Sequence, residues 1–270
     1  MTKAWRLFTQ YLSTVYACRN TIKALTVREI KVRYVGSLGG LAWSIIHPLV
    51  IILVYWMVFS VGFKIQPSSN IPFIVAFLCG FIPWSLFNET LMANTQAIIK
   101  NTHLATKVVF PTEVLPLVNF LASLITHGIM LVILLGVMIF NGISPTFYNL
   151  QFLYYLLPLT IFILGLSWIT SALNVFYRDV GQVILALLNL WFWLTPIVWM
   201  LEMMPEPYSF YLKLNPMVHV VEGYRNSFLH GVPFWQHPGA EIYLWGCSIL
   251  FFVLGGWVFR RLKWEFAEVL

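Results

Sequence analysis

The chain has 270 residues, of which 60% are hydrophobic and only 10% are charged. Soluble domains carry roughly 25% charged residues, so this composition excludes an ordinary soluble protein and indicates a membrane protein. The formal net charge of +6 does not indicate a nucleic-acid partner, because the basic residues lie beside long apolar stretches. The three cysteines are widely separated and lack metal-ligand spacing, so we expect no metal site from them.

The N-terminal stretch is amphipathic and then basic. Apolar residues recur there at three- and four-residue spacing, which places them on one helical face: Trp5, Phe8, Leu12 and Val15. We predict that residues 1–35 form an amphipathic interface helix on the membrane surface. A solvated helix that merely precedes the first span explains the same pattern. The stretch has no short apolar core with a cleavage site, so no cleaved signal peptide is expected.

Long stretches of the sequence contain no Asp, Glu, Lys or Arg. A helix rises about 1.5 Å per residue, so a hydrocarbon core of about 30 Å needs about 20 apolar residues. The stretches therefore predict an all-α integral membrane protein with six transmembrane helices. We place these spans at residues 38–62, 72–97, 115–140, 151–176, 181–201 and 240–259.

The cations are distributed unequally between the two sides of these spans. Thirteen of the 16 Lys and Arg residues fall on one side, which holds Lys3, Arg6, Arg19, Lys23, Arg28, Lys31, Arg33, Lys100, Lys107, Arg178, Arg260, Arg261 and Lys263. The other side holds only Lys64, Lys213 and Arg225. Because cytoplasmic loops carry the excess of cations, we expect both termini in the cytoplasm.

The stretch 202–239 on the predicted outer side differs from the short loops elsewhere. It contains several prolines together with apolar runs such as 217–221. It is too polar to span and too apolar to lie free in water. We predict an outer re-entrant region, since irregular backbone at membrane depth must be covered by protein or line a wet cavity.

The sequence has no chemistry that would drive or catalyse a reaction by itself. It lacks a GxxxxGK[ST] phosphate loop, so it does not bind ATP by that route, and it has no GxSxG elbow. Ionisable candidates inside the spans are few: His47, Glu89 and His127. The spacing of His219, His230 and His237 matches no zinc pattern. We therefore predict that the chain is not an enzyme, with no catalytic residues, no metal and no cofactor of its own.

Aromatic residues make up 17% of the chain, and some lie deep in the predicted spans. Flat apolar rings with a polar edge can stack on sugar faces, which suits a long polymer that slides past them. Helix packing and lipid contact explain most such residues equally well. The predicted substrate path consists of Tyr34, Trp43, Tyr55, Trp56, Phe59, Trp191, Phe192 and Trp193.

Several strings resemble the ABC-2 type polysaccharide export permeases. The segment 28–34, reading REIKVRY, and the residues up to Pro48 resemble the start of the first span in that family. Further blocks match at 80–84, 107–116, 174–182, 215–231 and 259–270. The blocks cover nearly the whole chain in the right order, and the resemblance is nearest to exporters of the O-antigen type.

This resemblance implies partners and roles. The permease would form a homodimer with two separate ABC ATPase subunits on the cytoplasmic side, where ATP and Mg²⁺ would bind. It would export a polysaccharide linked to a polyprenyl diphosphate. Arg28, Lys31 and Arg33 would contact the lipid pyrophosphate, or else membrane head groups. The residues expected to couple to the ATPase are Lys100, Lys107, Phe110, Pro111, Arg178, Asp179 and Gln182.

Other readings of the sequence remain open. An ABC-2 permease for capsule, teichoic acid, lipid or drug would have the same architecture with a different cargo. A carrier driven by an ion gradient would depend on Glu89. A membrane scaffold without transport activity is the third alternative.

Overall fold

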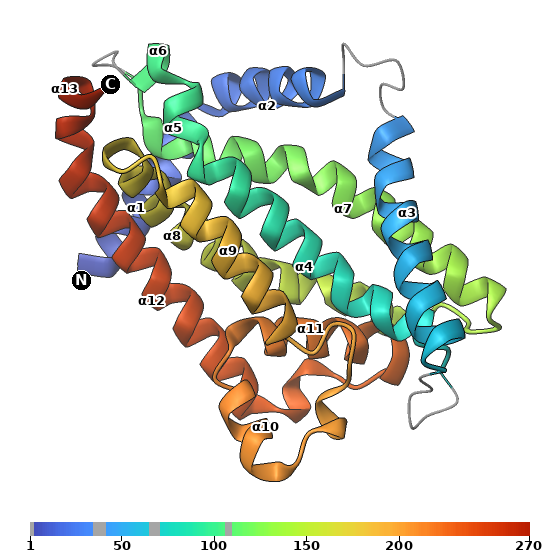
Figure 1. Ribbon diagram of the computed structural model, residues 1–270. Coiled ribbons are helices and arrows are strands. Elements are labelled where there is room, and N and C mark those ends of the chain that lie inside the picture. Colours follow the sequence, from blue (N-terminus) through green and yellow to red (C-terminus); the bar gives the residue numbers. More distant parts are fainter. Residues whose placement is uncertain (1–2, 35–41, 65–70, 106–109) are drawn as a thin grey trace.

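The computed structural model describes residues 3–34, 42–64, 71–105 and 110–270 (Figure 1). Every regular element in these residues is helical. Five helical segments among them are long and apolar enough to cross a membrane. The predicted all-α integral membrane fold is therefore confirmed.

The long helices lie at five of the predicted spans. The first is α3, Trp43–Trp56, which continues as a π-helical segment, Met57–Gly62. The others are α4 (Phe73–Thr95), α7 (Leu115–Phe140), α8 (Phe152–Phe176) and α12 (Pro238–Leu262). Residues 38–41 of the first predicted span lie outside the described residues. Short 3-10 turns precede α7 at Thr112–Val114 and α8 at Phe147–Gln151.

The predicted extent of the fifth span, 181–201, is wrong. The helix there, α9, runs from Val180 to Trp193, and its 14 residues are too few to cross about 30 Å. Pro196 follows three residues later, and a helix that continued through it would lose a hydrogen bond and clash with the carbonyl of Phe192. Residues 194–200 instead form an irregular segment, so the count of six spans stays a prediction.

The N-terminal region is two helices, not the single helix predicted over 1–35. Helix α1 is Lys3–Ala17 and α2 is Arg19–Tyr34, with a break at Cys18. Helix α1 is held by Tyr11, whose buried ring packs edge-on against Trp168 with the centroids 5.0 Å apart. Helix α2 packs against α7 and lies at the same end of the molecule as α5 (Ala97–Lys100) and α6 (Thr102–Ala105) (Figure 1).

Helix α4 is the most buried of the long helices and packs against α7, α8, α9 and α11. Helix α12 packs along α8 over most of its length. The two glycines Gly165 and Gly255 bring these backbones together, since a Cβ on either would overlap the main chain of the other helix. The chain ends with a 3-10 turn, Lys263–Glu265, and α13, Phe266–Val269.

The region between α9 and α12 is folded rather than a simple loop. It holds a 3-10 turn (Leu201–Met203), α10 (Glu206–Leu212), α11 (Pro216–Arg225), a π-helical turn (Asn226–His230) and a second 3-10 turn (Phe234–Gln236). Helix α11 is buried against α4. The Arg225 side chain is only 3% exposed and donates to Glu222 (2.8 Å) and to the carbonyls of Ile197 and Trp199. These bonds satisfy carbonyl groups of the irregular segment after α9.

Candidate functional site

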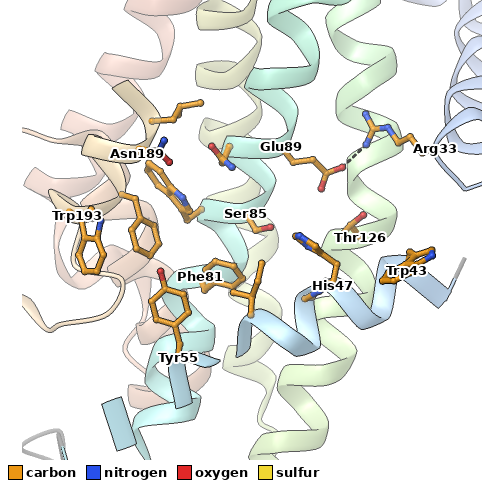
Figure 2. A pocket seen from close by; sticks show the side chains of 16 residues that line it. Arg33, Trp43, His47, Tyr55, Phe81, Ser85, Glu89, Thr126, Asn189 and Trp193 are labelled. Carbon is orange, nitrogen blue, oxygen red and sulfur yellow. Dashed lines mark hydrogen bonds and ion pairs between the residues drawn. The ribbon is translucent and has the colours of Figure 1, made fainter. Parts of the chain in front are cut away.

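A candidate site is a cavity of about 740 Å³ between α3, α4, α7 and α9, with Arg33 of α2 at its edge (Figure 2). A cavity of this size falls in the range that holds small ligands. One part of its wall is aromatic and another is polar. The lining residues are Arg33, Trp43, His47, Pro48, Ile51, Tyr55, Phe81, Trp84, Ser85, Asn88, Glu89, Thr126, Leu188, Asn189, Phe192 and Trp193.

The aromatic wall comes from three helices. Tyr55 of α3 stacks on Phe77 of α4, with ring centroids 4.8 Å apart, and lies 6.0 Å from Phe192 of α9. Trp84 of α4 lies 5.8 Å from Phe192 at a T-shaped angle. Such offset and edge-to-face contacts add to the stability gained by apolar burial. The rings therefore form a fixed surface, and the walls of the cavity are set by packing between helices.

The polar wall follows one face of α4. Ser85, Asn88 and Glu89 are three and four residues apart, so they lie on the same side of the helix and line the cavity together. Glu89 is the only charged residue in α4. The Glu89 carboxylate accepts from Arg33 Nη1 and, at 3.0 Å, from the hydroxyl of Ser123 on α7. The ion pair with Arg33 stabilises a charged carboxylate inside a span, so its presence there does not require a role in proton transfer.

Arg33 makes contacts with three elements. Its Nε donates to Glu29 of the same helix at 3.2 Å, and its Nη1 donates to Glu89 of α4 and to Ser123 of α7. The side chain is 17% exposed and that of Glu89 is 33% exposed. The end of α2 is thus tied to the polar wall of the cavity, where Figure 2 shows Arg33 and Glu89 facing each other.

The structure brings together some of the predicted path residues and not others. Trp43, Tyr55, Phe192 and Trp193 line the cavity. Trp56 is exposed and outside the cavity lining, and Phe59 stacks between Tyr55 and Phe73. Trp191 is taken up by packing against Trp84 and Phe87, and its Nε1 donates to Asn215 at 2.8 Å. The side chain of Tyr34 lies outside the described residues.

The other predicted phosphate partners lie away from the cavity lining. Arg28 donates from Nη2 to the Asn101 side chain at 3.0 Å, which connects α2 to the segment after α5. Lys31 is exposed. Of the three basic residues, Arg33 alone lines the cavity, although the sequence pattern gave no reason to prefer it.

The described residues among those predicted to couple to an ATPase lie in two regions, from the end of α5 to the start of α7 and at the start of α9, which are at one end of the molecule (Figure 1). Lys100 ends α5 and is exposed, and Phe110 and Pro111 are partly buried before α7. Arg178, Asp179 and Gln182 are exposed at the start of α9. Lys107 lies outside the described residues.

Sequence reasoning missed a buried polar network beneath these loops. Asn174 is fully buried, and its Nδ2 donates to the carbonyl of Thr95 (3.0 Å) while its Oδ1 accepts from the backbone N–H of Gly181 (3.1 Å). Asn94 donates to Ser167 (2.8 Å) and accepts from Asn119 (2.9 Å). The available signal was a set of amides and hydroxyls at the end of α4, at the start of α7 and in the second half of α8, since buried polar groups are kept where they are hydrogen-bonded.

A second cavity, of about 670 Å³, lies between the 3-10 turn Leu201–Met203, α11 and the start of α12. Its lining is mostly polar and includes His219, Glu222 and Lys213. The His219 Nε2 lies 2.8 Å from the carbonyl of Lys213. Burial lowers the pKa of His219 below its ordinary value, with the nearby Lys213 charge acting in the same direction.

Comparison with known proteins identifies the family. The profile of the ABC-2 type transporter family matches residues 20–229. An O-antigen export system permease protein RfbA of Myxococcus xanthus is 32% identical over 260 residues, covering 94% of this chain and 96% of the relative. An RfbA of Klebsiella pneumoniae is 28% identical, covering 91% and 93%. A polysialic acid transport protein KpsM of Escherichia coli is 27% identical, covering 78% and 82%. Because the profile match and the M. xanthus relative both extend over most of the helices described above, this chain belongs to the ABC-2 type transporter family.

Proposed function

We propose that this chain is the permease subunit of an ATP-driven exporter that moves a lipid-linked polysaccharide of the O-antigen type across the bacterial inner membrane. The names of relatives that match more than nine-tenths of the chain support this cargo. The observation that carries the proposal is the cavity, which combines aromatic faces, amides and hydroxyls with one guanidinium at its edge. A lipid-linked sugar chain presents the complementary groups: sugar faces, hydroxyls and an anionic phosphate anchor.

A polar polymer needs such a cavity because each unpaired polar group costs several kcal/mol in hydrocarbon. Asn88, Asn189 and Ser85 offer donors and acceptors for sugar hydroxyls. Tyr55 and Trp193 offer faces on which pyranose rings can stack without one fixed hydrogen-bond pattern. Arg33 offers a charged donor to a phosphate oxygen.

A homodimer would complete the path. The two helices that flank the cavity carry exposed apolar side chains, which are Ile46, Leu49, Val50 and Leu53 on α3 and Val183, Leu187 and Leu190 on α9. A second copy placed against these faces would bury them and close the open side of the cavity. The polymer would then pass between α3 and α9 of the two subunits. The region 202–239 would close this path at rest.

Two separate ATPase subunits would dock at the end that carries α5, α6 and the start of α9. This side is expected to be cytoplasmic because it holds most of the cations. Asn174 bonds the last turn of α4 to the first turn of α9, so both docking loops would move as one unit. Since α4 and α9 also line the cavity, a push on the loops would change its shape.

The test is export in vesicles. The permease and its ATPase are reconstituted with a lipid-linked oligosaccharide, and transfer to the far leaflet is followed with and without ATP. Transfer should need ATP and both subunits. Transfer that continues without the ATPase would refute the proposal, and ATP-dependent transfer of a drug or phospholipid in place of the glycolipid would refute the cargo. Capsular polysaccharide is the second candidate cargo, favoured by the similarity to KpsM.

A further inference from the structure

Arg33 binds Glu89 through one nitrogen atom, Nη1, rather than through two parallel N–H groups. Its Nη1 donates to Glu89 Oε1 and to the Ser123 hydroxyl, and the Ser123 hydroxyl in turn donates to the same Glu89 Oε1. The neighbouring Nη2 is buried and has no hydrogen-bond partner among the described residues. A guanidinium binds a carboxylate or phosphate most strongly through two parallel N–H bonds. The contact to Glu89 therefore leaves part of the binding capacity of Arg33 unused.

The charges around Arg33 also favour an incoming anion that replaces a carboxylate over one that binds beside both carboxylates. Two carboxylates, Glu29 and Glu89, contact one guanidinium, so this group of three side chains carries a net negative charge. An anion that approached with both carboxylates in place would be repelled. Glu29 is on the same helix as Arg33 and stays beside it. Glu89 belongs to α4 and is the partner that an incoming anion can replace.

We propose that Glu89 is a resident counter-ion which the phosphate group of the entering ligand displaces from Arg33. The phosphate would take the place of the carboxylate and bond to Nη1 and Nη2 together. Glu89 would keep its bond to Ser123. The inference rests on the proposed function, because it takes the anchor of the glycolipid to be the source of the phosphate.

This exchange would make Glu89 a competitor that sets how strongly a charged anchor must bind to reach Arg33. A neutral ligand such as a lipid alcohol does not compete for Arg33, so the ion pair persists and the affinity for the alcohol does not depend on Glu89. A monophosphate has fewer charges and oxygens than a diphosphate and would compete less well. The cavity is large enough to hold a diphosphate and the first sugar beyond it, since it measures about 740 Å³. Arg33 would thus favour diphosphate anchors, while Glu89 lowers their affinity by competing for Arg33 and leaves the binding of uncharged lipids unchanged.

The test measures binding to the purified permease in nanodiscs of phosphatidylcholine alone. The probes are geranylgeranyl diphosphate, geranylgeranyl monophosphate, geranylgeraniol and inorganic diphosphate. Wild type should bind the prenyl diphosphate best. Glu89→Gln should bind it about tenfold more tightly, because a competing charged hydrogen bond is gone. Geranylgeraniol binding should not change in this variant. Arg33→Gln should lose the preference for diphosphate over alcohol.

Matched variants separate this role from a structural one. Ser123→Ala removes the hydroxyl that bonds to both Arg33 and Glu89 and leaves the charges in place. This variant should therefore rank the four probes by affinity in the same order as wild type. Arg33→Gln with Glu89→Gln keeps two amides that can bond to each other and should bind diphosphate and alcohol alike. Unfolding temperature and elution volume verify that each variant is folded. Preference for the prenyl diphosphate over inorganic diphosphate identifies the lipid as the source, and equal binding identifies a free anion.

Two results would overturn the exchange. One is a folded Glu89→Gln protein whose diphosphate affinity equals that of wild type or falls below it. The other is a change of the same size for geranylgeraniol, since a purely structural ion pair would affect both probes. Either result can occur while ATP-dependent glycolipid export remains intact, so the failure of this inference is distinct from a failure of the proposed function.

Discussion

Gly165 of α8 and Gly255 of α12 lie against each other so closely that a Cβ on Gly255 would overlap the carbonyl of Gly165. The neighbouring backbone of Phe251 and Phe252 would likewise overlap a Cβ on Gly165. Small residues at such crossings let two membrane helices approach and gain dispersion contacts along their length. This crossing fixes α12 against α8.

We predict that Gly255→Ala destabilises the protein by about 1–3 kcal/mol or prevents its assembly, because the backbones must separate. The measurement is thermal unfolding in detergent, followed by circular dichroism. Gly246→Ala is the matched control on the same helix, since a Cβ there meets nothing within 4 Å. An equal loss of stability in both variants would show that the crossing is not the cause.

The Asn174 bonds predict a second effect, on coupling. Asn174→Leu removes a donor to Thr95 and an acceptor from Gly181, and leaves two buried backbone groups unpaired. We expect a loss of about 2–4 kcal/mol in unfolding free energy. In the reconstituted complex, ATP hydrolysis should continue while export falls. Asn141→Leu is the control, because that exposed side chain bonds only to a carbonyl of its own helix. Parallel loss of hydrolysis and export would argue against a role in coupling.

The cavity predicts which aromatic residues affect transport. Tyr55→Ala and Trp193→Ala remove faces that line it, and each should lower the export rate by about two- to tenfold. Trp56→Ala alters the neighbouring ring, which is exposed outside the cavity lining, and should export at the wild-type rate. The rates are compared in the vesicle assay at equal protein content. A larger defect in Trp56→Ala than in Tyr55→Ala would place the path elsewhere.

The lowered pKa of His219 predicts that the folded protein loses stability in mild acid. Its pKa is lower in the folded protein than in the unfolded chain, so the unfolded chain binds more protons between the two values. The contribution to stability is complete above the ordinary pKa of about 6.5 and is lost as the pH falls through the lower folded value. The groups that face His219 are Lys213, Glu222 and Tyr243.

Unfolding temperatures at neutral and mildly acidic pH test this. His219→Gln should lose less stability on acidification than wild type, because glutamine does not titrate. His103→Gln, at an exposed position on α6, serves as the control and should behave as wild type. The same pH dependence in wild type and His219→Gln would contradict the prediction.

The helices were predictable from the sequence because apolar length and prolines both act locally. The stretch 115–140 coincides with α7, and Pro116 at its start has the fixed φ that suits a first turn. The end of α9 was missed because the apolar run continues past Pro196, and hydropathy outweighed the proline. The break at Cys18 carries no composition signal at all, since neither glycine nor proline is near it.

For the candidate site, the sequence indicated which kinds of residue take part, but not which individual residues line the cavity. Tyr55 and Trp56 are equally aromatic neighbours, and only the way α3 packs on α4 decides which one reaches the cavity. The Arg33–Glu89 pair joins residues far apart in the chain and depends on α2 docking beside α4 and α7. Neither fact is encoded in spacing along a single helix.

Arg225 changes how the charge on the predicted outer side is counted. It is one of the three cations assigned there, yet its guanidinium is enclosed and shared between Glu222 and main-chain oxygens of the segment after α9. Its N–H groups take the place of water as hydrogen-bond donors to carbonyl oxygens in a stretch of chain that is not helical. Lys64 and Lys213 are the exposed cations of that group. The predicted outer side consequently presents fewer exposed cations than its sequence suggests, and a neutral residue at position 225 would disturb folding rather than orientation.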